Sequence, residues 1–188
     1  MNSYEEPRVT KFTFNLLNRV LNSQPKNSEE KEEFQKLNNF FNKPEACDIL
    51  LTENKLTLLH LAALYNDVKT VKYLLDKGAN PNIPDNDQQL PIHLTYNFQI
   101  IKLLIKKCPF MINRQNCVGL TALHIAIKNK NYETMKYLLA KNADPNIKTI
   151  FDQDAWNYAK SSLAATAILE EYTQKQKNIK KCKNSVLE

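Results

Sequence analysis

TLLHLAA occupies residues 57–63, and versions of this phrase return at regular intervals along the rest of the chain. LPIHL follows at 90–94, TALHIAI at 121–127, and a worn copy, DAWNYA, at 154–159. Self-similarity at a period of about 30 residues is typical of stacked helical units, none of which can bury its apolar face without a neighbour. The phrase therefore predicts a repeat protein built from helices.

The segments that follow the phrase are repeated as well. VKYLLDKGANPN at 71–82 matches MKYLLAKNADPN at 135–146 almost position for position. Val71 and Leu74 stand at helical spacing and predict the inner face of a second helix. Gly78 is placed to supply the positive-φ residue that ends this helix. Each unit is thus expected to contain two helices and a turn.

This pattern resembles the ankyrin repeat, whose unit has a turn, a short helix opening with a Thr-Pro-Leu-His-like phrase, and a longer second helix. The resemblance covers residues 52–172 and includes two near-complete copies, one shortened copy and one worn terminal copy. It implies an all-α fold, an ankyrin-repeat α-solenoid of stacked helix–turn–helix units with short turn or hairpin fingers.

The regions outside the four copies suggest two further parts of the chain. Residues 10–50 carry apolar side chains at helical spacing, and ACDI at 46–49 resembles a degraded GANPN. We expect them to form a helical cap over the first repeat. The lysine-rich tail is expected to extend the last helix. The predicted organisation is an N-terminal helical capping unit (1–50), a repeat stack (51–172, with units at about 52–83, 85–113, 116–147 and 150–172) and a basic C-terminal tail (173–188).

The second repeat departs from the family's pattern. Leu90 replaces the threonine that caps the first helix elsewhere, and Thr95 and Tyr96 replace the paired alanines. Its second helix also arrives early, because Ile101 lies 30 residues after Val71 instead of 33. We therefore expect a short first helix and weaker coupling to neighbouring repeats in this copy.

Composition limits the classes of protein to which the chain can belong. The 188 residues are 43% hydrophobic, enough for the core of one ordinary domain. The two glycines form no phosphate-binding pattern such as G-x-x-x-x-G-K. No apolar run approaches the roughly 18 residues of a membrane helix, and the polar N-terminus does not resemble a secretory signal. A soluble, cytoplasmic protein without a transmembrane segment is expected.

The cysteines do not indicate a metal site. They form no C-x-x-C pair and fall at unrelated points of the repeat, so we expect free thiols and no bound zinc. The four positions are Cys47, Cys108, Cys117 and Cys182.

The histidines share one position of the repeat, which argues against a joint metal site. Stacked helices lie about 8–10 Å apart, whereas zinc ligands lie about 2.0–2.1 Å from the ion. His60, His93 and His124 are therefore expected to bond backbone groups of neighbouring turns. No G-x-S-x-G motif or nucleophile–base pair is recognisable, so we expect no enzymatic activity and no cofactor.

The net charge of +6 and the isoelectric point near 9.0 raise nucleic acid as a partner. The lysines, however, are spread along the exposed faces of the second helices and in the tail. Only three arginines occur, and no stripe combines aromatic and basic residues. A solvated lysine face is the preferred interpretation, and an anion-binding protein that takes nucleic acid or acidic membrane is the alternative.

The resemblance to ankyrin repeats implies binding through turn tips and the exposed side of each first helix, which form a concave surface. The apolar members of this set are not needed by the core and indicate a protein partner, unless some of them fold back on neighbouring loops. The candidate protein-binding residues are Glu53, Asn54, Leu56, Leu64, Tyr65, Asn86, Asp87, Gln89, Asn97, Phe98, Cys117, Val118, Leu120, Lys128, Asn129, Ile150 and Phe151.

The functional interpretation is a protein–protein interaction module that acts as a monomer and takes no small-molecule substrate. The resemblance allows a scaffold, an inhibitor, or an effector that an intracellular bacterium delivers into the cytosol of its host. Shape and apolar complementarity would provide the affinity. The salt dependence of binding separates this hypothesis from the anion-binding alternative, because neutralising phosphates releases counterions.

Overall fold

A computed structural model describes residues 54–184 and seven earlier positions: Ser28, Lys31, Glu32, Gln35, Lys36, Asn39 and Asp48. The side chains of residue 180 and of residues 182–184 are outside this description, and the predicted N-terminal capping unit lies almost wholly outside it. The chain divides into two compact units, residues 1–111 and 112–188, here called unit 1 and unit 2. Every regular element from residue 54 to residue 184 is helical, which confirms the predicted all-α fold class.

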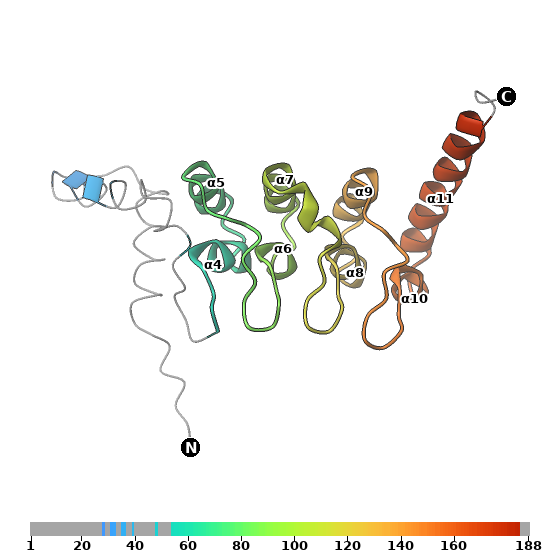
Figure 1. Cartoon of the computed structure of the whole chain (residues 1–188), viewed down its shortest axis with the longest axis horizontal. Coiled ribbons are helices and arrows are strands. Elements are labelled where there is room, and N and C mark those ends of the chain that lie inside the picture. Colours follow the sequence, from blue (N-terminus) through green and yellow to red (C-terminus); the bar gives the residue numbers. More distant parts are fainter. Residues whose placement is uncertain are drawn as a thin grey trace, which may run out of the picture. The chain divides into compact units, whose positions relative to one another are not determined.

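Unit 1 packs its helices as two layers. The first helices, α4 and α6, lie side by side, and the second helices, α5 and α7, lie side by side above them (Figure 1). A long turn connects α5 to α6, and its tip projects beyond the layer of first helices (Figure 1). The described helices are α4 (Leu58–Leu64), α5 (Val68–Asp76), α6 (Pro91–Leu94), α7 (Phe98–Lys107) and the 3₁₀ helix η1 (Pro109–Asn113), which crosses the boundary between the units.

The start and end of the helices in the first repeat follow from its sequence. Thr57 caps α4, because its side chain accepts from the backbone N–H of His60. Asp67 caps α5 by accepting from two backbone amides of its first turn. Val71 and Leu74 are both fully buried (0% exposed), as their spacing predicted. Gly78 follows the C-cap with φ of +97°, so it has the predicted role in ending α5.

The second repeat has the predicted short first helix. Helix α6 contains only four residues, and it ends at Thr95, whose backbone is extended. Leu90 has no side-chain oxygen, but its backbone N–H donates to Nδ1 of His93 at 2.9 Å. Leu90 and Ile92 are nevertheless almost fully buried (1% exposed). The shortened repeat therefore keeps its place in the core of unit 1 while losing a turn of helix.

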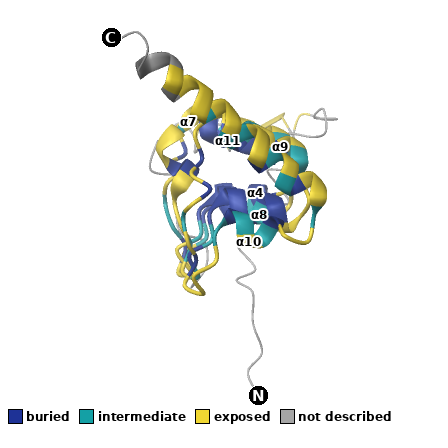
Figure 2. Ribbon diagram, turned by 90° about the vertical axis from the view of Figure 1, so that its right-hand side faces the viewer, coloured by how far each residue is buried: buried dark blue, intermediate teal, exposed yellow. Residues whose placement is uncertain are grey.

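Unit 2 repeats the two-layer arrangement, with first helices of seven and five residues. Helix α8 packs on α9 and α10, and α11 packs on α9 and α10 (Figure 1). The buried side of the first helices and the exposed turn tips are visible in Figure 2. The helices are α8 (Ala122–Lys128), α9 (Tyr132–Ala140), α10 (Ala155–Ala159) and α11 (Leu163–Asn184).

Helix α11 has 22 residues, so it continues well past the nine residues of α9. Ala165 and Leu169 are fully buried (0% exposed) in its first half. Its second half is largely exposed, and Lys175 pairs with Glu171 one turn earlier at 2.6 Å. The basic tail thus extends the last helix, as expected, through residue 184.

Asp48 accepts the same kind of hydrogen bond in unit 1 as Asn113 accepts in unit 2. Oδ1 of Asp48 accepts from the N–H of Asn80 at 2.8 Å, and Oδ1 of Asn113 accepts from the N–H of Asp144 at 2.9 Å. Asn80 and Asp144 occupy matching positions of the repeated second half. Asp48 therefore stands where a preceding repeat would place its last asparagine.

Most turns that need a left-handed residue are built without glycine. Both glycines of the chain, Gly78 and Gly119, have positive φ. In the described part of the chain, φ also lies between 53° and 66° at Lys55, Asn66, Gln88, Lys130, Asn142 and Asp152.

Candidate functional site

The hairpin between α5 and α6 in unit 1 is held by one carboxylate. Oδ1 of Asp85 accepts from the backbone amides of Asp87 (2.9 Å) and Gln89 (2.7 Å). Asp85 itself is buried (5% exposed), and its own N–H donates to the carbonyl of Gln89. The amide of Asn86 also donates to the carbonyl of Asn54 in the preceding turn. The tip, from Asn86 to Gln88, is left facing solvent.

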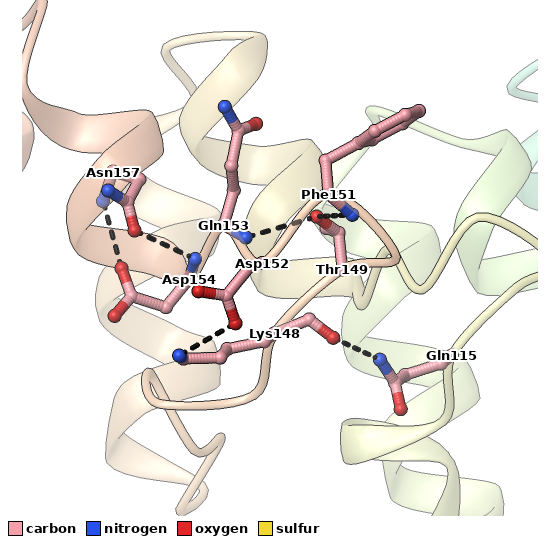
Figure 3. A network of polar contacts seen from close by, with 8 residues as sticks. All are labelled: Gln115, Lys148, Thr149, Phe151, Asp152, Gln153, Asp154 and Asn157. Atoms are coloured by element: carbon pink, nitrogen blue, oxygen red, sulfur yellow. Dashed lines mark hydrogen bonds and ion pairs between the residues drawn. The ribbon is translucent and has the colours of Figure 1, made fainter.

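Unit 2 builds two hairpins with the same bonding scheme and other side chains. Oδ1 of Asn116 accepts from the amides of Val118 (3.2 Å) and Leu120 (2.9 Å). In the next hairpin the hydroxyl of Thr149 accepts from the amides of Phe151 (3.3 Å) and Gln153 (3.4 Å) (Figure 3). Asp85, Asn116 and Thr149 therefore perform one structural task.

The two hairpins of unit 2 are also tied to each other. The amide of Ile150 donates to the carbonyl of Val118 at 3.2 Å. Nε2 of Gln115 donates to the carbonyl of Lys148 at 2.9 Å (Figure 3). It also donates to the carbonyl of Gly119 at 2.8 Å, so one side chain bridges both hairpins. A Cβ on Gly119 would meet Cα of Thr149 at 2.7 Å, so only glycine permits this approach. The tips are consequently held in a fixed arrangement.

The charged pair at the second hairpin is a surface feature. Nζ of Lys148 lies 2.8 Å from Oδ1 of Asp152, with the side chains 55% and 81% exposed (Figure 3). The hydrogen bond and charge of Asp152 raise the pKa of Lys148. Exposed pairs of this kind contribute little to stability. The pair does, however, neutralise the one cation of this hairpin.

The structure divides the predicted binding residues by exposure. Glu53 lies outside the described residues. Exposed positions are Asn54, Leu64, Tyr65, Asn86, Asp87, Cys117, Lys128, Asn129, Ile150 and Phe151, and half-buried positions are Leu56, Gln89, Asn97, Phe98, Val118 and Leu120.

Large apolar side chains are exposed in both units, after a first helix in unit 1 and before a first helix in unit 2. In unit 1, Leu64 (45% exposed) and Tyr65 (59%) end α4. In unit 2, Ile150 (65%) and Phe151 (68%) are at a hairpin tip, and the ring of Phe151 points away from the polar network (Figure 3). Leu56, Val118 and Leu120, by contrast, pack partly against their surroundings, as the alternative interpretation of the apolar set allowed.

The structure corrects the register of Asn97 and Phe98. They were included among the candidate residues because, counted from the start of α6, they match Leu64 and Tyr65 at the end of α4. Instead, Asn97 caps α7, where its side chain accepts from two amides of the first turn, and so corresponds to Asp67 in the preceding repeat. Compared with the first repeat, the second repeat lacks residues in α6 and directly after it. The cap of its second helix therefore comes earlier in the repeat. A binding role for either residue stays a prediction.

Tyr96 was missed as a candidate. It was interpreted as a substitute for a buried alanine, but its side chain is 64% exposed at the end of α6, whereas Thr95 beside it is buried. The signal was present in the sequence, because a tyrosine is too large for a position that holds alanine in the neighbouring copies.

His60 has the expected bond to a backbone group of the neighbouring turn, whereas the backbone bond of His124 is to its own N-cap. Nδ1 of His60 accepts from the N–H of Thr57 (3.1 Å), so its proton is on Nε2, which donates to the carbonyl of Gln89 (3.1 Å). Nδ1 of His124 accepts from the N–H of Thr121 (3.2 Å), while its Nε2 is buried without a bond of ordinary geometry. Burial lowers the pKa of both imidazoles, and the nearby carbonyls of Gln89 and Gln153 oppose this effect.

The described residues contain no cluster of three or more potential metal ligands. Among the helices described between residues 54 and 184, none combines the length and apolar character needed to cross a membrane. Cys108 and Cys117 are free thiols.

A family model described as ankyrin repeats (3 copies) matches the chain twice, over residues 30–96 and 59–149. These matches cover more than half of the sequence, and the chain belongs to the ankyrin-repeat family. Ankyrin repeats generally mediate protein–protein interactions and are typically binding modules without enzymatic activity. The first match begins at residue 30, inside the region predicted as a capping unit.

Similar proteins come from animals and a virus. Transient receptor potential cation channel subfamily A member 1 of Homo sapiens is 35% identical over 92 residues, 47% of this chain and 8% of that protein. Alpha-latroinsectotoxin-Lt1a of Latrodectus tredecimguttatus is 37% identical over 108 residues, 56% of this chain and 7% of the toxin. A putative ankyrin repeat protein of fowlpox virus is 41% identical over 91 residues, 45% of this chain and 27% of the viral protein. The chain thus spans only a small part of the length of these relatives.

Proposed function

We propose that this protein is a protein-binding module that uses the hairpin tips and the exposed ends of its first helices. The observation that carries the proposal is the position of the exposed apolar side chains. Leu64, Tyr65, Ile150 and Phe151 occur on turns and helix ends that the core does not need. Exposed aromatic and aliphatic groups on a fixed backbone provide contact area at a low entropic cost, which favours protein recognition.

The module would bind by surface complementarity, perform no reaction and act as a monomer in the cytoplasm. A scaffold, an inhibitor and an effector acting in a host cytosol would all use the same surface. The alternative, binding of nucleic acid or acidic membrane, is supported by the net charge of +6 and the lysines on the second helices. It predicts affinity that depends on cations rather than on apolar side chains.

A pull-down with matched variants tests the proposal. The full chain, the double variant Tyr65→Ala/Phe151→Ala and the double variant Lys72→Glu/Lys136→Glu are immobilised and exposed to nuclease-treated lysate. We expect a protein that the wild-type chain and the lysine variant retain, and that the aromatic variant loses although its melting temperature is unchanged. Equal retention by the aromatic variant would contradict the proposal. Loss caused by the lysine variant, or by nuclease, would favour the anion-binding alternative.

A further inference from the structure

Unit 2 presents cations at the ends of its first helices, opposite the hairpins that present apolar groups. Lys128 is the last residue of α8, Lys130 follows in the turn, and Lys160 caps the end of α10. All three side chains are exposed, and within the part of the chain that the structure describes their ammonium groups form no ion pair. They therefore have charge available for a partner, unlike Lys148, which pairs with Asp152.

The acidic groups nearby do not cancel this charge. Asp154 is the N-cap of α10 and so lies at the opposite end of this helix from Lys160. Asp152 is engaged by Lys148. Glu133 lies in the first turn of α9, beyond the turn that carries Lys130. The helix ends of unit 2 thus remain positively charged.

The apolar groups precede a first helix of unit 2, and the basic groups follow the first helices. The hairpins lead into the first helices at one end, and the turns to the second helices leave at the other (Figure 2). Helices α8 and α10 pack side by side, with Ile125 and Tyr158 half-buried between the two edges. Helix α8 has seven residues and is therefore about 10 Å long.

We infer that unit 2 binds an extended segment of a partner protein that carries an apolar anchor and, a few residues away, carboxylates. The anchor would contact Ile150 and Phe151, and the acidic side chains would meet Lys128 and Lys160. Because an extended chain advances about 3.3–3.6 Å per residue, the carboxylates belong about three to five residues from the anchor. This inference rests on the proposed function and specifies the chemistry of its partner.

Charge complementarity favours this occupant over two others. A second copy of the same face would bring a second set of these lysines into the contact, whereas an acidic segment would pair with them. A nucleic acid would leave Ile150 unused and would prefer arginine with aromatic stacking. An acidic apolar segment is the occupant that satisfies both edges.

The test selects peptides without assuming a partner. Phage-displayed random peptides of about 12 residues, which extend to about 40 Å, are enriched on the immobilised full chain. An enriched peptide, and a counterpart with each Asp and Glu replaced by Asn and Gln, are then titrated by fluorescence anisotropy. We expect enriched sequences to carry acids about three to five residues from an aromatic or aliphatic residue, and the amide counterpart to bind at least about tenfold more weakly.

Variants locate the binding face. Ile150→Ala/Phe151→Ala and Lys128→Gln/Lys160→Gln should each weaken binding by about tenfold or more. Leu163→Ala, which alters a still more exposed apolar residue of unit 2 (92% exposed), and Lys177→Gln on α11 are the controls and should change nothing. Equal melting temperatures establish that the variants fold. The same titrations with an oligo(dT) strand and with phosphatidylserine vesicles measure the other classes of ligand.

The other possible results count against this inference alone or against both it and the proposed function. Enriched peptides without acids, or peptides whose affinity depends on Tyr65 and not on Phe151, would overturn the inference and leave the proposed function standing. Loss of affinity in Lys177→Gln equal to that in the helix-end variant would assign binding to the tail and overturn it too. Failure to enrich any peptide would count against both proposals, as would lysine-dependent binding of oligo(dT) or vesicles alone.

Discussion

Unit 1 and unit 2 share a backbone plan but carry opposite surface chemistry along it. In unit 1 the apolar groups, Leu64 and Tyr65, are at the end of a first helix, and the hairpin at 85–89 has a polar tip. In unit 2 the apolar group Phe151 is at a hairpin tip, and Lys128 occupies the helix end. The same backbone plan can therefore present apolar groups to a partner either at a helix end or at a hairpin tip.

The comparison shows how few residues the backbone plan requires. Each hairpin is held by one side-chain oxygen that accepts from backbone amides. These side chains are Asp85 in unit 1 and Asn116 and Thr149 in unit 2. In the hairpins of Asp85 and Thr149 the tip residues Gln88 and Asp152 face solvent, whereas Gly119 in the hairpin of Asn116 is buried. The exposed tips are available for recognition. The shared plan itself resides in the buried residues and in the caps.

The largest effect should come from the residues that the two units share. Leu74 and Leu138 occupy the same position of the second helix, and both are fully buried (0% exposed). Leu74→Ala and Leu138→Ala should each lower the free energy of unfolding by about 2–5 kcal/mol, because each leaves a cavity. Urea denaturation measures this. A loss below about 1 kcal/mol in one variant alone would show that the units are packed unequally.

The two glycines should differ more than their similar φ angles suggest. Gly119→Ala would force a Cβ to within 2.7 Å of the backbone of Thr149, whereas a Cβ at Gly78 would meet nothing within 4 Å. Gly78→Ala should therefore cost about 1–2 kcal/mol, the ordinary cost of the left-handed region. Gly119→Ala should cost clearly more. Thermal unfolding of the two variants gives the ranking, and equal losses would mean that the hairpins of unit 2 can separate freely.

Acid should weaken both units through their buried histidines. Burial lowers the pKa of His60 and His124 below the ordinary value of 6.5, so the unfolded chain takes up protons first as pH falls. Their contribution to stability is complete above about pH 6.5 and declines as pH falls toward the lower folded-state pKa. Denaturation at several pH values should show this decline. His124→Asn, which copies Asn157 of the worn repeat, should reduce the slope, and an unchanged slope would exclude His124 as a source.

A smaller difference is expected between α6 and α8. Helix α6 has four residues and α8 has seven, so fewer helical hydrogen bonds hold the first helix of the second repeat. Hydrogen exchange should be several-fold faster across residues 92–97 than across residues 122–128 under native conditions. Equal protection would indicate that burial of Leu90 and Ile92 compensates fully for the lost turn.

The sequence predicted the fold well because repetition shows the same physical requirement several times. Gly78, the cap at Thr57 and the short α6 could all be inferred by comparing copies. The register after α6 could not, because the pattern gives the number of missing residues but not where they are removed. This is why Asn97 was misplaced and Tyr96 was missed. The half-burial of Leu56 was also beyond the pattern, since it depends on contacts with neighbouring loops.

The turns that place a residue other than glycine in the left-handed region are sites where a substitution can raise stability. A residue with a Cβ costs about 1–2 kcal/mol in this region, and glycine would exchange that strain for about 0.5–1 kcal/mol of chain entropy. Lys55, Gln88 and Lys130 lack the short polar side chain that eases the strain for Asn and Asp. Glycine at each of the three sites should raise stability by up to about 1 kcal/mol. The protein can therefore be stabilised by substitutions in its turns that leave the buried core unchanged.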